Sequence, residues 1–228
     1  MIASKKEFFG GVGLMIGFVI VLIIFFSPVF GGKNGLDYLD NLYNSISKGS
    51  AYYIPKVKEA CEPFKGNSVN VTLAMADKSH AENTAKLFKA SGAEVLITGA
   101  TLKVVGDLGM ILENCLADAD AMYINDGAKI SGKYGYDEKR AMFNWWKAFN
   151  EMEKGLKRQK KFKEAKVVAL VVKKAVESSY NYYKIEPQKI TDRWGIVIIS
   201  LLFYVIYTLW YGFAIMFMFE GWGMKLEH

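Results

Sequence analysis

Two apolar stretches near the ends of the chain decide its fold. Residues 8–30 read FFGGVGLMIGFVIVLIIFFSPVF, and residues 196–219 read IVIISLLFYVIYTLWYGFAIMFMF. Neither stretch contains a charged residue. At ~1.5 Å of rise per residue, a helix of either length spans the ~30 Å hydrocarbon core of a bilayer. We therefore predict a membrane α+β protein with two transmembrane helices, at 8–30 and 195–219, which excludes an ordinary soluble protein.

The residues that flank these stretches bear on orientation. Lys5 and Lys6 precede the first stretch, and no small-residue cleavage site follows it, which favours an uncleaved anchor over a signal peptide. The first helix usually dominates orientation. We expect both ends in the cytoplasm and the middle outside a bacterial-type inner (plasma) membrane, in the periplasm or the extracellular space. The basic residues before the second stretch, Lys184, Lys189 and Arg193, weigh against this orientation.

The composition of the 228 residues excludes several classes of site. The two cysteines, Cys61 and Cys115, are too few for a disulfide-rich scaffold or a four-thiolate zinc site. They either pair in an oxidising compartment or are two buried thiols. Residues 226–228 resemble the start of a purification tag, so His80 is the one histidine to consider. We expect no metal, no cofactor and no catalytic residue.

The middle of the chain shows strand patterns within residues 69–136. Apolar residues alternate over Val69–Ala76, and two β-rich runs, 94–98 and 101–105, are separated by Gly99 and Ala100, which predicts a hairpin. The spacing of Ser79 and Glu82 fits a capping box that starts a helix, and Asp107 caps another. The order β-α-β-β-α predicts a small α/β domain that is partly ferredoxin-like. We interpret residues 31–68 as a helical linker region and residues 125–136 as the longest loop.

Residues 137–193 follow a helical pattern. Apolar residues recur at three-to-four spacing from Met142 to Leu156, and a basic segment follows. We predict a long helical arm folded as a hairpin that turns near this segment. A single continuous helix is the alternative, because neither Pro nor Gly interrupts residues 156–183.

The basic segment attracts anionic groups. Residues 154–166 contain seven Lys or Arg and one Glu. Such a run contacts anionic lipid headgroups or an acidic partner, or it is only a solvated hairpin tip. No motif for nucleic acid is present, so nucleic acid is not an expected partner. The residues we assign to the contact are Lys157, Arg158, Lys160, Lys161 and Lys163.

Small residues on the first apolar stretch indicate close helix packing. Gly10, Gly13 and Gly17 share one helical face, and small residues let helix backbones approach in lipid. The face packs on the second stretch or on another copy of the chain. Trp145 and Trp146 add an assembly signal, because adjacent residues of one helix cannot both face the same core.

Hydroxyl side chains gather on the second apolar stretch. A hydroxyl at membrane depth requires a hydrogen-bond partner, so this face points at protein, water or a ligand. A pore lining, a quinone or lipid site, and plain helix-to-helix bonding are the alternatives. The residues are Ser200, Tyr204, Tyr207, Thr208 and Tyr211.

The layout of two terminal spans around an α/β domain with a long helical arm resembles the plan of bacterial polysaccharide co-polymerases. The chain lacks the proline-rich segment that the family carries at its second span, so the resemblance extends to the plan alone. We predict a non-enzymatic integral membrane protein that forms a homo-oligomer or serves as an accessory or scaffold subunit of a membrane complex. A homo-oligomeric channel and a membrane anchor that binds quinone or haem are the alternatives.

Overall fold

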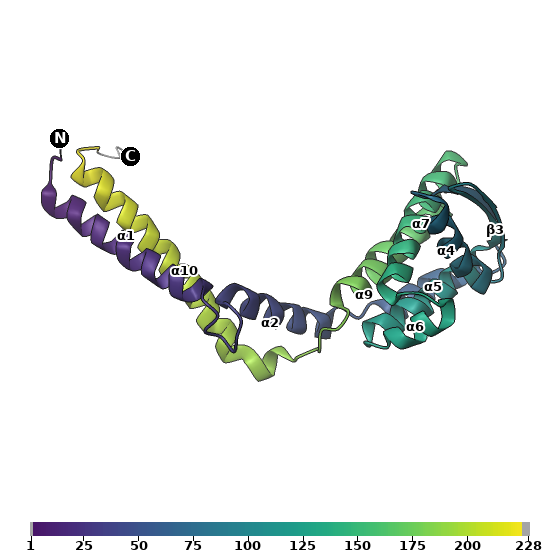
Figure 1. Ribbon diagram of the computed structural model, residues 1–228, viewed down its shortest axis with the longest axis horizontal. Coiled ribbons are helices and arrows are strands. Elements are labelled where there is room, and N and C mark those ends of the chain that lie inside the picture. Colours follow the sequence, from purple (N-terminus) through teal and green to yellow (C-terminus); the bar gives the residue numbers. More distant parts are fainter. Residues whose placement is uncertain (1, 225–228) are drawn as a thin grey trace. The chain divides into compact units, whose positions relative to one another are not determined.

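The computed structural model describes residues 2–224, so the expected tag remnant at 226–228 lies outside the described residues. The chain divides into two compact units. One unit combines the two ends of the chain, up to Gly49 and from Pro187 onward, and the central domain runs from Ser50 to Glu186. Most of the described residues are helical, with one small sheet in the central domain (Figure 1).

Helices α1 (Lys5–Phe26) and α10 (Ile190–Gly221) lie side by side in the terminal unit, with α2 (Gly35–Ser50) in the same unit (Figure 1). Gly11 lies against Met218 and Gly17 against Trp210, so α1 and α10 run antiparallel. Both are long and apolar enough to cross a membrane. Compared with the predicted spans, α1 ends before Ser27 and α10 begins earlier, at Ile190.

The glycines of α1 divide between two faces of the helix. A Cβ on Gly11 would lie 2.7 Å from the Met218 nitrogen and 2.8 Å from the Ala214 oxygen, so only glycine permits this approach. Gly17 faces the Trp210 ring, whose Nε1 donates to the Leu14 carbonyl at 2.9 Å. Gly11, which the spacing of small residues did not single out, is therefore one of the close contacts of the helix pair, and Gly221 of α10 against Phe8 of α1 is another.

The sheet of the central domain has three antiparallel strands, β1 (Ser68–Ala74), β2 (Glu94–Thr98) and β3 (Thr101–Asp107). Their order is β1-β3-β2, with β3 between the other two. The predicted hairpin is confirmed, with Gly99 at φ +61° in the turn between β2 and β3. Helix α4 connects β1 to β2, and α5 follows β3, which is the connection expected for a split β-α-β unit.

Helices cover one face of this sheet. Val69, Val71 and Leu73 of β1 and Leu102 and Val104 of β3 are buried, whereas their neighbours on the other face are exposed on β1 and exposed or half-buried on β3. The helical elements of the domain are α3 (Ile54–Cys61), η1 (Glu62–Phe64), α4 (Lys78–Ala90), α5 (Leu108–Tyr123), α6 (Gly127–Tyr134), α7 (Glu138–Arg158), α8 (Phe162–Val171), the π-helical turn η2 (Val172–Val176) and α9 (Glu177–Tyr182).

The helical hairpin predicted for the arm is confirmed. Helix α7 ends at Arg158 and α8 begins at Phe162, with Lys160 at φ +60° in the turn. The arm is not separate from the α/β domain, because α7 and α8 contribute Trp145, Phe149 and Val168 to the same core as the sheet. The linker region 31–68 is also divided, since α2 belongs with the terminal helices and α3 with the central domain.

Two local predictions are wrong. Helix α4 begins earlier than predicted, because the Asp77 side chain accepts from the His80 nitrogen at 2.7 Å and Ser79 lies inside the helix. A carboxylate at the N-cap also complements the helix dipole. The expected loop at 125–136 contains α6, which ends at Gly135 in the left-handed conformation.

The glycine contact gives the first prediction. Gly11→Ala forces α1 and α10 apart and lowers the free energy of unfolding by ~1–3 kcal/mol, the usual cost of overpacking. Gly10→Ala is the matched control, because no described atom lies within 4 Å of the methyl group that it adds. Unfolding in mixed detergent and SDS, followed by near-UV circular dichroism, measures both variants. Equal stability of the two variants would contradict the close packing at Gly11.

Candidate functional site

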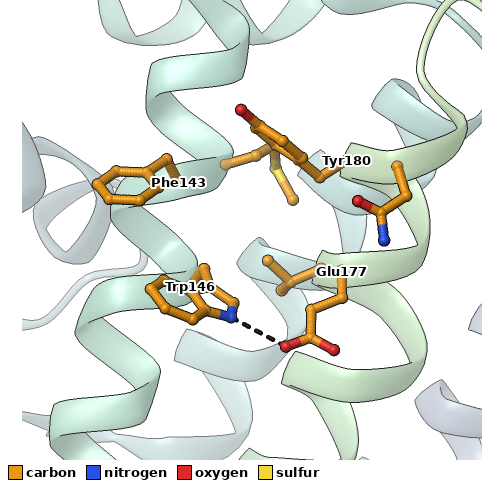
Figure 2. A pocket seen from close by; sticks show the side chains of 7 residues that line it. Phe143, Trp146, Glu177 and Tyr180 are labelled. Carbon is orange, nitrogen blue, oxygen red and sulfur yellow. Dashed lines mark hydrogen bonds between the residues drawn. The ribbon is translucent and has the colours of Figure 1, made fainter.

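A pocket of about 440 Å³ opens between α7 and the helical run formed by η2 and α9. Figure 2 shows Phe143 and Trp146 on one helix and Glu177 and Tyr180 on the other, with Trp146 directed toward Glu177. Three aromatic rings and one carboxylate therefore line the same space. The full lining is Met142, Phe143, Trp146, Val176, Glu177, Tyr180 and Asn181.

The two adjacent tryptophans of α7 have different roles. Trp145 is fully buried, packs on Phe88 and Phe149, and donates from Nε1 to Asp118 Oδ2 at 2.8 Å. It therefore contacts its own domain, and the prediction that it contributes to assembly is corrected. Trp146 lies about 100° further around the helix and faces the pocket. Its Nε1 donates to Glu177 of α9, so Trp146 contacts another helix of its own domain, and a role in assembly stays a prediction.

The η2 turn brings the α9 side chains to the pocket. The Glu177 nitrogen bonds the Val172 carbonyl, a π-helical i→i+5 bond that interrupts the regular helix. Single π turns inside helices are rare and are frequently found at functional sites. Glu177 and Tyr180 follow directly, three residues apart and on one face.

The chemistry of the pocket suits a cation. Glu177 is the only charged residue in the lining, and its Oε1 accepts from Trp146 Nε1 at 3.0 Å. Aromatic faces attract cations through their quadrupole. Two cations of α7 already lie over these rings without lining the pocket: Lys139 Nζ is 5.7 Å from the Tyr180 centroid, and the Arg140 guanidinium is 5.4 Å from the Phe143 centroid.

A buried histidine lies beside the same aromatic group. The His80 ring stacks on Phe143 with centroids 6.0 Å apart, and neither of its ring nitrogens has a hydrogen-bond partner in the described part of the chain. Burial lowers the pKa of His80, and the nearby charge of Arg140 lowers it further. Its imidazole is therefore neutral in the folded protein near pH 7. From the sequence an exposed residue is expected here, and that expectation is wrong because His80 is buried.

The sequence-predicted basic segment lies at the α7–α8 turn. Lys157 pairs with Glu153, and Lys161 Nζ donates to the Ser68 carbonyl at 3.3 Å. Arg158 lines a groove beside β1, together with Gln159. Lys160 and Lys163 are exposed. A partner for this segment stays a prediction.

The five hydroxyl residues that were predicted to form one face of α10 have different surroundings in the structure. Ser200 Oγ lies 2.6 Å from the Tyr43 hydroxyl of α2, and Thr208 Oγ1 donates to the Tyr204 carbonyl of its own helix. Tyr207 and Tyr211 pack on Phe18 of α1. Tyr204 is 58% exposed. A pore or ligand face formed by these residues stays a prediction.

The two cysteines of the central domain are free and buried. Burial raises the pKa of the Cys61 thiol to about 11 and raises that of Cys115 as well. This agrees with the interpretation of two buried thiols rather than a disulfide. Gly10 and Gly13 of the predicted glycine face have no described atom within 4 Å of the place that a Cβ would take, whereas Gly17 contacts α10.

Comparison with known proteins gives no match to a family model, to a curated protein or to a solved structure. The pocket is therefore described from its own residues. Sequence reasoning singled out Trp146 of this pocket but assigned no role to Glu177 or Tyr180. The signal in the sequence that could have identified Glu177 and Tyr180 was their i, i+3 spacing on a helix expected to pack against α7.

The buried imidazole makes stability depend on pH. The unfolded chain binds a proton at His80 near pH 6.5, whereas the folded chain binds it only at lower pH. The contribution of the neutral His80 to the stability of the folded chain is therefore complete above pH 6.5. It declines as the pH falls toward the pKa of His80 in the folded chain. We expect the melting temperature of the central domain to fall between pH 7.5 and 5.5.

His80→Leu removes the titrating group while keeping an apolar side chain of similar size. We expect a flatter melting temperature over the same pH interval, measured by circular dichroism. If the melting temperatures of the wild type and of His80→Leu changed equally with pH, the imidazole would be ruled out as the cause of the pH dependence.

Proposed function

We propose that this chain is a non-enzymatic, membrane-anchored binding protein. Helices α1 and α10 cross a bacterial-type inner membrane, and the central domain, on the periplasmic or extracellular side, binds an organic cation. The observation that carries the proposal is the pocket that Phe143, Trp146, Tyr180 and the Glu177 carboxylate line together.

The surface of the terminal helices supports the membrane anchor. Leu202, Ile206 and Leu209 of α10 are each more than half exposed, and most of α1 is exposed as well. An apolar surface of this extent is unfavourable in water and ordinary in lipid. A helix of 22 residues, the length of α1, spans ~33 Å, which suits a hydrocarbon core of ~30 Å.

The pocket supports a ligand with a positive charge and an apolar body. Its volume of about 440 Å³ lies in the range of small-molecule sites. Oε1 of Glu177 accepts the hydrogen bond from Trp146, whereas Oε2 has no hydrogen-bond partner among the described residues. A quaternary or tertiary ammonium group meets the carboxylate and the ring faces at once, while Met142 and Val176 contact its alkyl or aryl part.

The lining favours binding over catalysis. Glu177 and Asn181 are its polar side chains apart from the Trp146 and Tyr180 ring groups. Glu177 is bonded to an indole N–H, not to a nucleophile that it could activate as a base. The pocket therefore offers recognition without an evident reacting group.

Removal of the Glu177 charge tests the ligand class. Glu177→Gln keeps the shape of the side chain and lowers the affinity for phenyltrimethylammonium by about fivefold to thirtyfold, because a desolvated charge contributes ~1–2 kcal/mol. Isothermal titration calorimetry of the full chain in lipid nanodiscs measures this. The neutral analogue tert-butylbenzene is expected to bind more weakly than the cation and to be insensitive to the substitution.

Glu164→Gln on α8 is the matched control, because it removes one carboxylate outside the pocket. The proposal fails if wild type, Glu177→Gln and Glu164→Gln bind the cation equally. It also fails if the neutral analogue binds wild type as tightly as the cation does.

Self-assembly in the membrane is a second candidate function, favoured by Tyr204. This residue lies near the middle of α10, its side chain is exposed, and its hydroxyl has no hydrogen-bond partner in the described part of the chain. A hydroxyl on a surface that faces lipid is costly unless another molecule satisfies it. A second copy of the chain can supply the partner.

Native mass spectrometry of the detergent-solubilised protein tests self-assembly. We expect a discrete multiple of 25.6 kDa for the wild type and a larger monomer fraction for Tyr204→Phe, which removes only the hydroxyl. Tyr207→Phe, whose ring packs on α1, is the matched control. A bare monomer for the wild type, or oligomers unaffected by Tyr204→Phe, would exclude assembly through this hydroxyl.

A further inference from the structure

The first strand of the sheet has a free edge. The order β1-β3-β2 leaves β1 paired on one side only. Met75 donates to the Ala100 carbonyl at 2.8 Å, and Leu108 donates to the Asn67 carbonyl at 2.8 Å. In an antiparallel pair the hydrogen-bonded positions alternate. The odd-numbered residues of β1 therefore bond β3, and the N–H and C=O groups of the even-numbered residues point to the open edge.

A groove of about 820 Å³ follows this edge. One wall is β1 with the start of β3, and the other is the last two turns of α7. Gly155 of α7 packs beside β1, since a Cβ there would lie 3.6 Å from Val71 Cγ1. The residues that line the groove are Asn70, Thr72, Ala74, Thr101, Glu151, Gly155, Arg158 and Gln159.

Side chains already use part of the edge as a hydrogen-bonding site. Gln159 Nε2 donates to the Asn70 carbonyl at 2.8 Å, and Lys161 Nζ donates to the Ser68 carbonyl at 3.3 Å. These two bonds confirm that the even-numbered carbonyls face outward. The outward N–H and C=O of Thr72, further along the groove, have no partner in the described part of the chain. An unpaired strand edge of this kind is a template for another strand.

The charges around the groove select an acidic occupant. Arg158 lines the groove, and Lys103 lies on β3 opposite Thr72. Neither forms an ion pair with another described residue. The one acidic residue in the lining, Glu151, is already paired with Lys154 at 2.9 Å and with Lys147 at 3.9 Å. The groove therefore carries net positive charge.

We propose that an extended, acidic segment of a partner protein adds to β1 as a fourth antiparallel strand. Main-chain hydrogen bonds supply affinity in such strand addition, and side chains at alternate positions supply specificity. In the complete β-α-β-β-α-β fold, the fourth strand lies beside the first. Among the described residues, no strand pairs with β1 on that side. An antiparallel segment directs its carboxyl end toward Ser68, where Arg158 and Lys161 lie.

The experiment uses the full chain in lipid nanodiscs and a fluorescein-labelled nonapeptide that alternates glutamate and valine. Fluorescence anisotropy measures binding, and hydrogen-exchange mass spectrometry locates it. We expect protection of the amides in residues 68–74. Two control peptides replace every second valine by proline, which removes backbone donors, or every glutamate by lysine, and both are expected to bind at least tenfold more weakly.

Thr72→Pro is the decisive variant. It removes the outward N–H without taking a bond from the β1–β3 ladder, and proline is tolerated at such edge positions. We expect at least a tenfold loss of peptide affinity, because one backbone bond is lost and the ring obstructs its neighbours. Thr72→Val, which keeps the N–H, is the matched control and is expected to bind within about twofold of wild type.

Arg158→Glu gives an independent test if Thr72→Pro fails to fold, as judged by its melting curve. This variant is expected to lose affinity for the glutamate peptide and to gain affinity for the lysine peptide. Failure of the glutamate peptide to bind wild type, protection outside residues 68–74, or binding unaffected by both variants would overturn the proposal. None of these outcomes depends on the cation pocket, so the two proposals fail or succeed separately.

Discussion

Asp118 lies buried on α5 and accepts hydrogen bonds from three side chains on two other helices. Trp145 Nε1 of α7 donates at 2.8 Å, Lys133 Nζ of α6 donates at 2.7 Å, and the Tyr134 hydroxyl also donates. A buried carboxylate is strongly unfavourable unless such donors surround it. Because Trp145 must reach the same carboxylate as the two donors of α6, this carboxylate fixes the rotation of α7 about its own axis within the central domain. Burial and the Asp118 charge raise the pKa of Tyr134, which keeps that donor protonated.

The rotation of α7 places both candidate surfaces. With Trp145 directed to the core, Trp146 and Phe143 necessarily face η2 and α9, where the cation pocket forms. The same helix ends beside β1, so that Gly155 and Gln159 border the strand edge. A small ligand and an extended partner segment would thus contact opposite parts of one helix.

Local patterns predicted the parts of the fold that depend on neighbouring residues. The β2–β3 hairpin, the α7–α8 turn and the two long apolar helices follow from alternation, turn residues and hydropathy. Features that depend on distant residues were missed. Gly11 differs from Gly10 only in what α10 places opposite it, and Glu177 acquires its role only when α9 lies against Trp146. The cap at Asp77 was missed because Ser79 offered an equally good local signal.

If α1 and α10 cross a bilayer, as the proposed function requires, the exposed side chains of α10 face lipid. Spin labels placed singly from residue 198 to residue 213 in nanodiscs report this through collisions with oxygen, which enters lipid, and with a water-soluble nickel chelate. We expect oxygen access to rise, and nickel access to fall, from residue 198 toward Leu209 and Phe213, which are both exposed and lie close to Trp210, the residue that bonds Leu14 near the middle of α1. Equal nickel access along the whole of α10 would show that the helix lies in water and would contradict the membrane anchor.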